Sequence, residues 1–115
     1  MTATEALTYV GLRGRQPAFG HGGPVVVGIV AGDDSCALAT PNWLERSGAS
    51  YEWGYEGAGP HLLASAILLD RVGRDVGYGV SRAFMRDVVA RLPHEFELSC
   101  DAVDAWLREH DLAAA

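Results

Sequence analysis

The chain is 115 residues long, of which 49% are hydrophobic and 21% are charged. This length fits one small domain, and the composition is typical of a globular protein rather than a disordered or fibrous one. Nine basic and 15 acidic side chains give a net charge of −6. The acidic balance disfavours nonspecific binding to nucleic acid and electrostatic docking on anionic lipid, since both need a positive surface.

The chain also shows no sign of a targeting segment or a structural metal. Its first residues contain no basic region followed by an apolar stretch, so we expect no secretory signal. The longest apolar run, at 62–69, is interrupted by Ser65 and is far shorter than the roughly 20 residues of a membrane span. Cys36 and Cys100 have no His or Cys at zinc-ligand spacing, and we expect both to be reduced, apolar core residues. We predict a cytoplasmic protein without a metal, a cofactor or a membrane contact.

The first third of the chain predicts three strands. Residues 8–12 favour a pleated backbone, and residues 13–24, which are rich in glycine and proline, predict an irregular loop. Residues 25–30 are β-branched at five of six positions and form the clearest strand. A turn at 32–35 then leads into a strand at 36–39, which completes a hairpin.

Helical segments dominate the rest of the chain. A short helix at 40–48 begins with an N-capping threonine followed by proline. A helix at 60–72 is apolar around most of its circumference, so we expect it to be buried at the centre of the domain. An amphipathic helix extends from about residue 75 or 79 to residue 92, where Pro93 stops it. A strand at 95–98 precedes a final helix that is capped by Ser99 and ends near residue 110.

These elements predict one α+β domain at residues 1–115. It has a small, mostly antiparallel sheet of four or five strands and about three main helices. In residues 49–55, Tyr51, Trp53 and Tyr55 alternate with small or polar residues. Period two places these aromatic side chains on one face of a strand, packed against the following helix.

The glycine-rich segment before that helix has two possible interpretations. The first turn of a helix leaves N–H groups unpaired, so a flexible entry can bind a phosphate or a carboxylate. However, Pro60 removes one donor, no Lys or Arg follows in the first turn, and the third glycine of a dinucleotide fingerprint is missing. The segment is either a tight turn or a ligand site. The residues of that candidate site are Trp53, Gly54, Tyr55, Gly57, Gly59, His61 and Arg13.

No catalytic constellation is recognisable in the sequence. The histidines at 21, 61, 94 and 110 are scattered, as surface or capping histidines usually are. Asp33 and Asp34 are expected in a solvated turn. Glu52 and Glu56 could act as paired carboxylates, but the alternation places both on the solvent side of the predicted strand. We therefore lean against an enzyme.

The segment 51–60 follows the pattern aromatic-x-Trp-Gly-Tyr-x-Gly-x-Gly-Pro. Together with the opening residues 9–14, Leu92-Pro93 and Trp106-Leu107, it makes the chain resemble a small domain family of unknown function. That family is found in bacteria, archaea and their mobile elements. The resemblance spans nearly the whole chain and implies a fold unit but no activity.

The sequence thus predicts a small non-enzymatic binding or interaction module, and the resemblance links it to phage or other mobile elements. An alternative is the binding of a nucleotide or other anion at the loop 54–61. A second alternative is an acidic inhibitor that mimics nucleic acid, although a net charge of −6 with nine arginines is mild for that role. The expected partner is a protein or a small anionic ligand, with no direct contact to nucleic acid.

Overall fold

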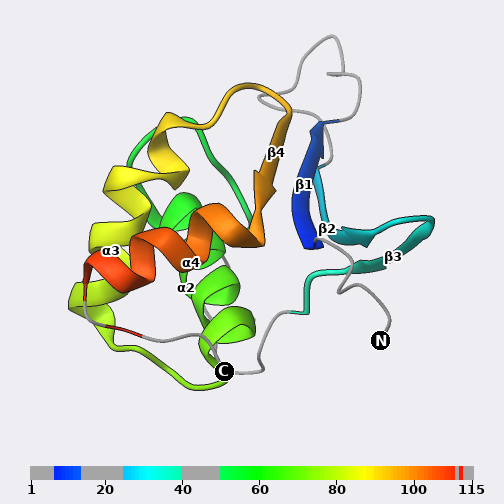
Figure 1. Cartoon of the computed structure of the whole chain (residues 1–115). Helices are drawn as coiled ribbons and strands as arrows, with labels where there is room; N and C mark the ends of the chain where they lie inside the picture. Colours follow the sequence, from blue (N-terminus) through cyan, green and yellow to red (C-terminus); the bar gives the residue numbers. More distant parts are fainter. Residues whose placement is uncertain (1–6, 14–24, 40–49, 111, 113–115) are drawn as a thin grey trace, which may run out of the picture.

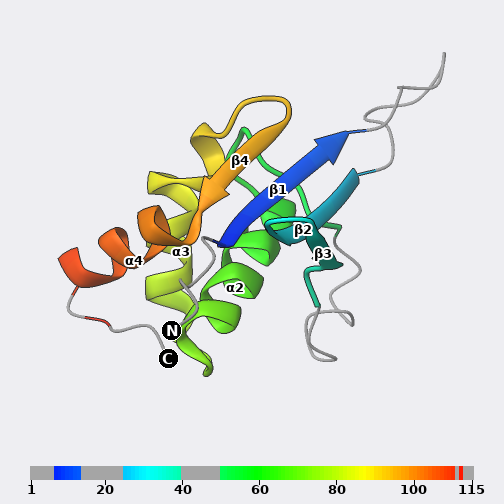
Figure 2. The same cartoon turned by 45° about the vertical axis from the view of Figure 1, so that its right-hand side comes forward.

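Four strands form one antiparallel sheet, in the order β3-β2-β1-β4. The computed structural model describes residues 7–13, 25–39, 50–110 and 112. Figures 1 and 2 show the helices gathered on one side of this sheet. The predicted α+β class is therefore confirmed. The predicted helix at 40–48, most of the predicted loop at 13–24 and the end of the C-terminal tail lie outside the described residues.

Each of the two inner strands of the sheet pairs on both of its sides. The four strands are β1 (Leu7–Arg13), β2 (Val25–Ala31), β3 (Asp34–Ala37) and β4 (Phe96–Ser99). β1 pairs with β2 along its full length and with β4 on its other side. β2 and β3 form the predicted hairpin, although β3 begins earlier than expected. Gly32 in its turn has a φ of +60°, a conformation that favours glycine.

The helices follow the predicted order with shifted ends. They are α2 (Ala58–Val72), α3 (Tyr78–Asp87), the 3₁₀ turn η1 (Val89–Arg91) and α4 (Cys100–Glu109). The predicted single helix ending at residue 92 is wrong in its last turn. The turn η1 instead buries Val89 and presents the Val89 carbonyl to the N–H of Gly54, at 3.0 Å. None of the helices in the described ranges is long and apolar enough to cross a membrane.

The hydrophobic core lies between the helices and one face of the sheet. Tyr9, Val27 and Leu98 project from the strands into this core. From the helices come the fully buried side chains of Leu63, Ile67, Leu68, Phe84 and Leu107. The prediction of a buried helix after the glycine-rich segment is confirmed, since α2 buries residues around most of its circumference.

The side of the sheet that faces away from the helices is called here the outer face. The alternation of side chains along each strand identifies its residues. Successive side chains of a strand point to opposite faces. Because Tyr9 and Val27 point to the helices, their neighbours point away from them. The outer-face residues are Thr8, Val10, Leu12, Val26, Gly28, Val30, Ser35, Ala37, Glu97 and Ser99. No described helix covers these positions (Figure 2).

The predicted strand at 49–55 is not formed. Residues 50–53 have no regular structure and residues 54–57 form bends. Gly54 has a φ of +89°, which turns the chain between Trp53 and Tyr55 and breaks the two-residue alternation. As a result Trp53 is 2% exposed and Tyr55 is 51% exposed. The predicted burial of Trp53 is confirmed, but its placement on one face with Tyr55 is wrong.

The two cysteines are free thiols in different environments. Cys100 is buried at the first position of α4, as expected. Cys36 is exposed, so its assignment to the core is wrong. Its register on β3 places it on the helix side of the sheet, but the β2–β3 turn extends away from the helices (Figure 1). No described helix therefore covers Cys36.

Polar contacts tie the helices to the sheet and to one another. The buried Tyr9 hydroxyl donates to the Asp70 carboxylate on α2. Burial and the Asp70 carboxylate raise the pKa of Tyr9. The next residue on α2 is Arg71, and its guanidinium donates two hydrogen bonds to Asp104 on α4, at 2.9 and 2.7 Å. These contacts fix α2 against β1 and α4.

The Ser99 cap should contribute measurably to stability. The Ser99 hydroxyl accepts a hydrogen bond from the Ala102 N–H at 3.1 Å, as the predicted N-cap requires. Ser99→Ala should lower the free energy of unfolding by about 1 kcal/mol, and Ser99→Asp should largely preserve it. Urea denaturation measures both variants, with Ser35→Ala on exposed β3 as a control. Equal losses for Ser99→Ala and Ser35→Ala would contradict the capping role.

Candidate functional site

Trp53 anchors the glycine-rich segment to the sheet. Its ring packs edge-on against Phe96 of β4, with centroids 4.9 Å apart. Its indole N–H donates to the His94 carbonyl oxygen at 2.9 Å, so the buried polar atom is satisfied. Phe96 in turn lies against Gly11 of β1, where an added Cβ would come 2.1 Å from the ring. Trp53 is therefore buried because it packs the glycine-rich segment against the sheet.

Arg13 is engaged inside the protein. Its guanidinium pairs with both carboxylate oxygens of Glu52, at 2.9 and 3.2 Å. It also lies 4.5 Å above the centroid of the Trp53 ring, in cation–π geometry. Both charged side chains are largely covered, with 12% and 25% of their surfaces exposed. The hypothesis that Arg13 supplies charge to an anion is weakened, because Glu52 already neutralises it.

Two glycines of the motif have structural explanations. Gly54 adopts a φ of +89°, which L side chains rarely adopt. A Cβ at Gly59 would lie 2.8 Å from the carbonyl oxygen of Ser50 and 2.8 Å from Cβ of Glu52. The Gly59 carbonyl oxygen also accepts the Glu52 N–H at 3.4 Å. Backbone conformation accounts for glycine at 54 and close chain packing for glycine at 59, where a larger residue would disturb the fold itself.

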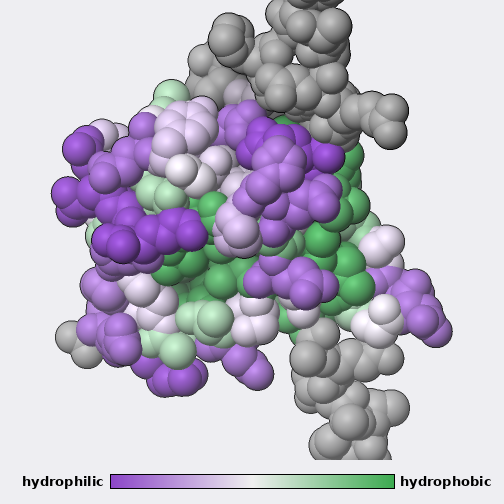
Figure 3. Space-filling model, turned by 90° about the horizontal axis from the view of Figure 1, so that it is seen from above, coloured by the Kyte–Doolittle hydropathy of each residue, from purple (hydrophilic) through white to green (hydrophobic). Residues whose placement is uncertain are grey.

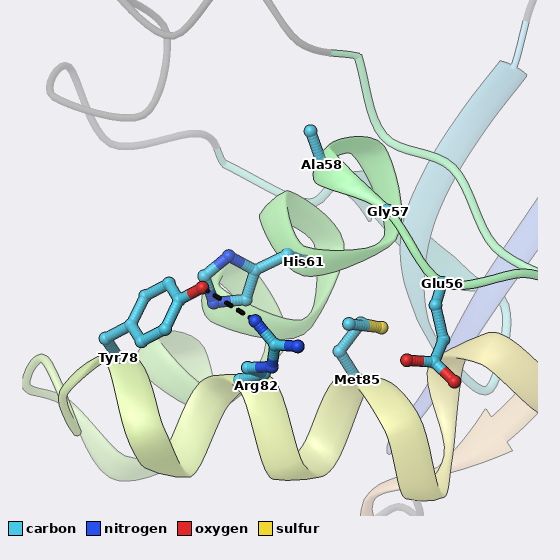
Figure 4. A pocket seen from close by; sticks show the side chains of 7 residues that line it. All are labelled: Glu56, Gly57, Ala58, His61, Tyr78, Arg82 and Met85. Carbon is cyan, nitrogen blue, oxygen red and sulfur yellow. Dashed lines mark hydrogen bonds between the residues drawn. The ribbon is translucent and has the colours of Figure 1, made fainter.

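Six of the seven predicted site residues divide between two open pockets, and Gly59 lines neither of them. One pocket, of about 540 Å³, is lined by Arg13, Glu52, Trp53, Gly54, Tyr55, Leu92, Pro93 and His94. The other, of about 460 Å³, lies at the start of α2 and is called here the α2–α3 pocket. It is lined by Glu56, Gly57, Ala58, His61, Tyr78, Arg82 and Met85 (Figure 4). The structure therefore separates Gly57 and His61 from Arg13, Trp53, Gly54 and Tyr55.

Three residues of the α2–α3 pocket come from a helix that sequence reasoning did not connect to the motif. Tyr78, Arg82 and Met85 project from α3 toward the start of α2 (Figure 4). Their spacing of four and three residues places them on one face of a helix, which was a detectable signal. What the sequence could not indicate is that this face lies opposite His61.

His61 is held in place by contacts with α3. Its Nε2 lies 2.8 Å from the Ser81 hydroxyl oxygen, within hydrogen-bond distance. The same hydroxyl oxygen lies 3.1 Å from the Tyr78 carbonyl oxygen. The Tyr78 ring packs edge-on against the imidazole, with centroids 4.9 Å apart.

The charge state of His61 depends on its surroundings. Burial, and after it the positive charge of Arg82, lower the pKa of His61 below its ordinary value. Near neutral pH the imidazole is therefore mostly uncharged, and Arg82 is the cation of the α2–α3 pocket. Within the described ranges, no group of three or more His, Cys, Asp or Glu is placed to hold a metal ion.

The fold defines a small α+β domain, with helices on one side of a four-stranded antiparallel sheet. A family model of unknown function, DUF6166, matches residues 9–109, and the chain belongs to this family. No curated protein and no solved structure matches the chain. The predicted resemblance to a domain family of unknown function is thus confirmed, while the motif and the range of organisms stay predictions.

Replacing Trp53 should destabilise the protein strongly. Trp53→Ala should lower the free energy of unfolding by about 3–5 kcal/mol, because it empties the space beside Phe96. Tyr55→Ala is the matched control, since this neighbouring aromatic residue is 51% exposed. Chemical denaturation measures both variants. A loss for Trp53→Ala as small as that of a surface substitution, ~0.5 kcal/mol, would overturn the anchoring role.

Titration should reveal the coupling between His61 and Arg82. The pKa of His61 should lie below the usual His value of about 6.5, and Arg82→Gln should raise it. Because the folded-state pKa is lowered, the unfolded state binds more protons just below pH ~6.5. The free energy of unfolding should therefore rise with pH through that window and level off above it.

NMR titration of the imidazole protons measures this pKa directly. Arg86→Gln, one helical turn away on α3, is the control and should leave the pKa of His61 close to that of the parent protein. If the pKa of His61 is the same in Arg82→Gln and in the parent protein, the guanidinium charge does not affect the imidazole.

Proposed function

We propose that the protein is an interaction module that docks a partner protein on the outer face of its sheet. The observation behind this proposal is the exposure of large apolar side chains on that face, near one end of the β1–β2 pair. Leu12 is 51% exposed and Val26 is 60% exposed, and the two lie directly opposite each other on β1 and β2. A solvated face of an antiparallel sheet usually presents polar residues instead.

The charge distribution supports the same role. Among the described strand residues, Glu97 is the one charged side chain whose register places it on the outer face. The other outer-face side chains are apolar or uncharged, although the whole chain carries a net charge of −6. Figure 3 shows hydrophobic surface on the right-hand side of the molecule, where Figure 1 places β1 and β2. Such a surface suits a partner that is apolar and uncharged at the contact.

The shape of the outer face supports anchoring of a partner side chain. Gly28 on β2 has no side chain and lies among larger neighbours. The resulting shallow depression of about 370 Å³ is lined by Val10, Leu12, Val26, Gly28, Val30, Ser35, Cys36 and Ala37. Interfaces concentrate their binding energy where one apolar side chain fills such a depression.

The finer expectations from the sequence remain part of the proposal. We place the protein in the cytoplasm and associate it with phage or other mobile elements on the basis of composition and resemblance. The alternative of an inhibitor that mimics nucleic acid is less favoured, since the proposed docking surface is nearly uncharged.

Photo-crosslinking in cells tests the docking surface. A photoreactive amino acid at position 26 should trap a partner protein, because Val26 is exposed on the outer face. The same probe at the exposed position 108 on α4 should give the background pattern. The specific product should fall sharply when Leu12→Gln is added, because a polar amide interrupts the apolar contact. A product at twice the mass of the chain would identify the partner as a second copy.

Two results would contradict the proposal. Identical products from positions 26 and 108 would show that the outer face has no preferred partner. A specific product at position 26 that survives Leu12→Gln would show that the apolar surface does not hold the partner. Leu12 and Val26 are exposed, so the Leu12→Gln change should leave the fold intact, and circular dichroism checks this.

A further inference from the structure

The α2–α3 pocket combines a cation, an aromatic ring and an apolar floor in one open cavity. Its volume of about 460 Å³ falls within the range of about 300–1,000 Å³ that small-molecule sites occupy. Figure 4 shows the Tyr78 and Arg82 side chains on one side of this cavity and Glu56 on the other. None of its lining residues belongs to the outer face of the sheet.

Arg82 offers a positive charge that the described part of the chain does not neutralise. Arg13 and Arg71 each pair with a carboxylate, at Glu52 and at Asp104. Arg82 instead donates to the Tyr78 hydroxyl at 3.1 Å, and that acceptor is uncharged. A guanidinium has five N–H donors in a planar fork that matches a phosphate. The contact with Tyr78 orients this fork and leaves most of its donors available.

The rest of the cavity suits a planar organic group. Tyr78 is 65% exposed, and its edge-on contact with His61 holds the ring in place. Met85 is 5% exposed, and its side chain lies between Arg82 and Glu56 in Figure 4. An aromatic ring and a thioether both favour contact with a heterocyclic base. The cavity therefore offers more than a site for an inorganic ion.

Three further features adjust the affinity for an anion. The imidazole of His61 adds a second positive charge when it is protonated, at the side of the cavity that holds Tyr78. The first turn of α2 adds partial positive charge to that of Arg82. The Glu56 carboxylate opposes both, and it can accept a hydrogen bond from an amino group on the ligand.

We infer that the α2–α3 pocket binds a nucleoside monophosphate, with the phosphate at Arg82 beside Tyr78, the base over Met85 and the exocyclic amino group toward Glu56. This activity is separate from protein docking on the outer face, because the two surfaces share no residue. It assigns Tyr78, Arg82 and Met85 of α3 to a ligand site together with Glu56 and His61 of the α2 region.

Calorimetric titration with AMP, adenosine and inorganic phosphate tests this site. AMP should bind more tightly than either fragment, because only AMP fills both halves of the cavity. Arg82→Gln should weaken AMP binding roughly tenfold, the size expected for a lost charge-assisted hydrogen bond. The matched control Arg86→Gln removes an arginine one turn away on the same helix and should leave the affinity unchanged.

Replacing the Glu56 carboxylate should change the affinity for an anion in the opposite direction. Glu56→Gln should strengthen the binding of inorganic phosphate severalfold, because it removes the repulsion. It should also reduce the preference for AMP over IMP, which lacks the amino group. Lowering the pH through the pKa of His61 should strengthen AMP binding in the parent protein and not in His61→Gln.

Three outcomes would overturn the inference. The first is no heat and no NMR shift at His61 or Tyr78 with millimolar AMP. The second is equal affinity in Arg82→Gln and the parent protein, with circular dichroism confirming that both are folded. The third is equal weakening by Arg82→Gln and Arg86→Gln, which would indicate nonspecific attraction to surface arginines. Leu12→Gln should leave AMP binding unchanged, so failure of the docking surface and failure of this site are distinguishable.

Discussion

The ring of Phe96 lies directly on the backbone of Gly11, and much of the architecture depends on this contact. A side chain at position 11 would push Phe96 away from β1 and loosen the pairing of β1 with β4. Trp53 packs on the same Phe96 ring and bonds to the carbonyl oxygen of His94, just before β4. The course of residues 50–57, and with it the start of α2, is therefore set by a close approach between two strands.

Local sequence patterns were sufficient for most of the fold. The β-branched run that became β2 and the cap at Ser99 are each set by a few neighbouring residues, so both were found. The predicted strand at 49–55 failed for a tertiary reason. Aromatic residues do alternate there in the sequence. However, the chain turns at Gly54, whose N–H donates a hydrogen bond to the carbonyl oxygen of Val89, 35 positions along the chain. Periodicity cannot reveal a contact of that kind.

Only some residues of the candidate site could be predicted from the sequence. The sequence singled out the glycine-rich segment, and His61, just after it, lines the α2–α3 pocket. Arg13, however, pairs with Glu52, which lies 39 positions along the chain. The guanidinium that does face the pocket, that of Arg82, belongs to a helix whose orientation depends on packing against α2. The sequence predicted the amphipathic helix that contains Arg82, but not which residues that helix faces.

The two edges of the sheet have a consequence for how other chains can approach it. Both edge strands, β3 and β4, are four residues long, and Ser99 at the end of β4 is already the cap of α4. A strand from another molecule could therefore form few ladder hydrogen bonds at either edge. Short edges of this kind limit edge-to-edge aggregation. They allow the sheet to expose an apolar face without also offering a template for growth into a larger β-structure.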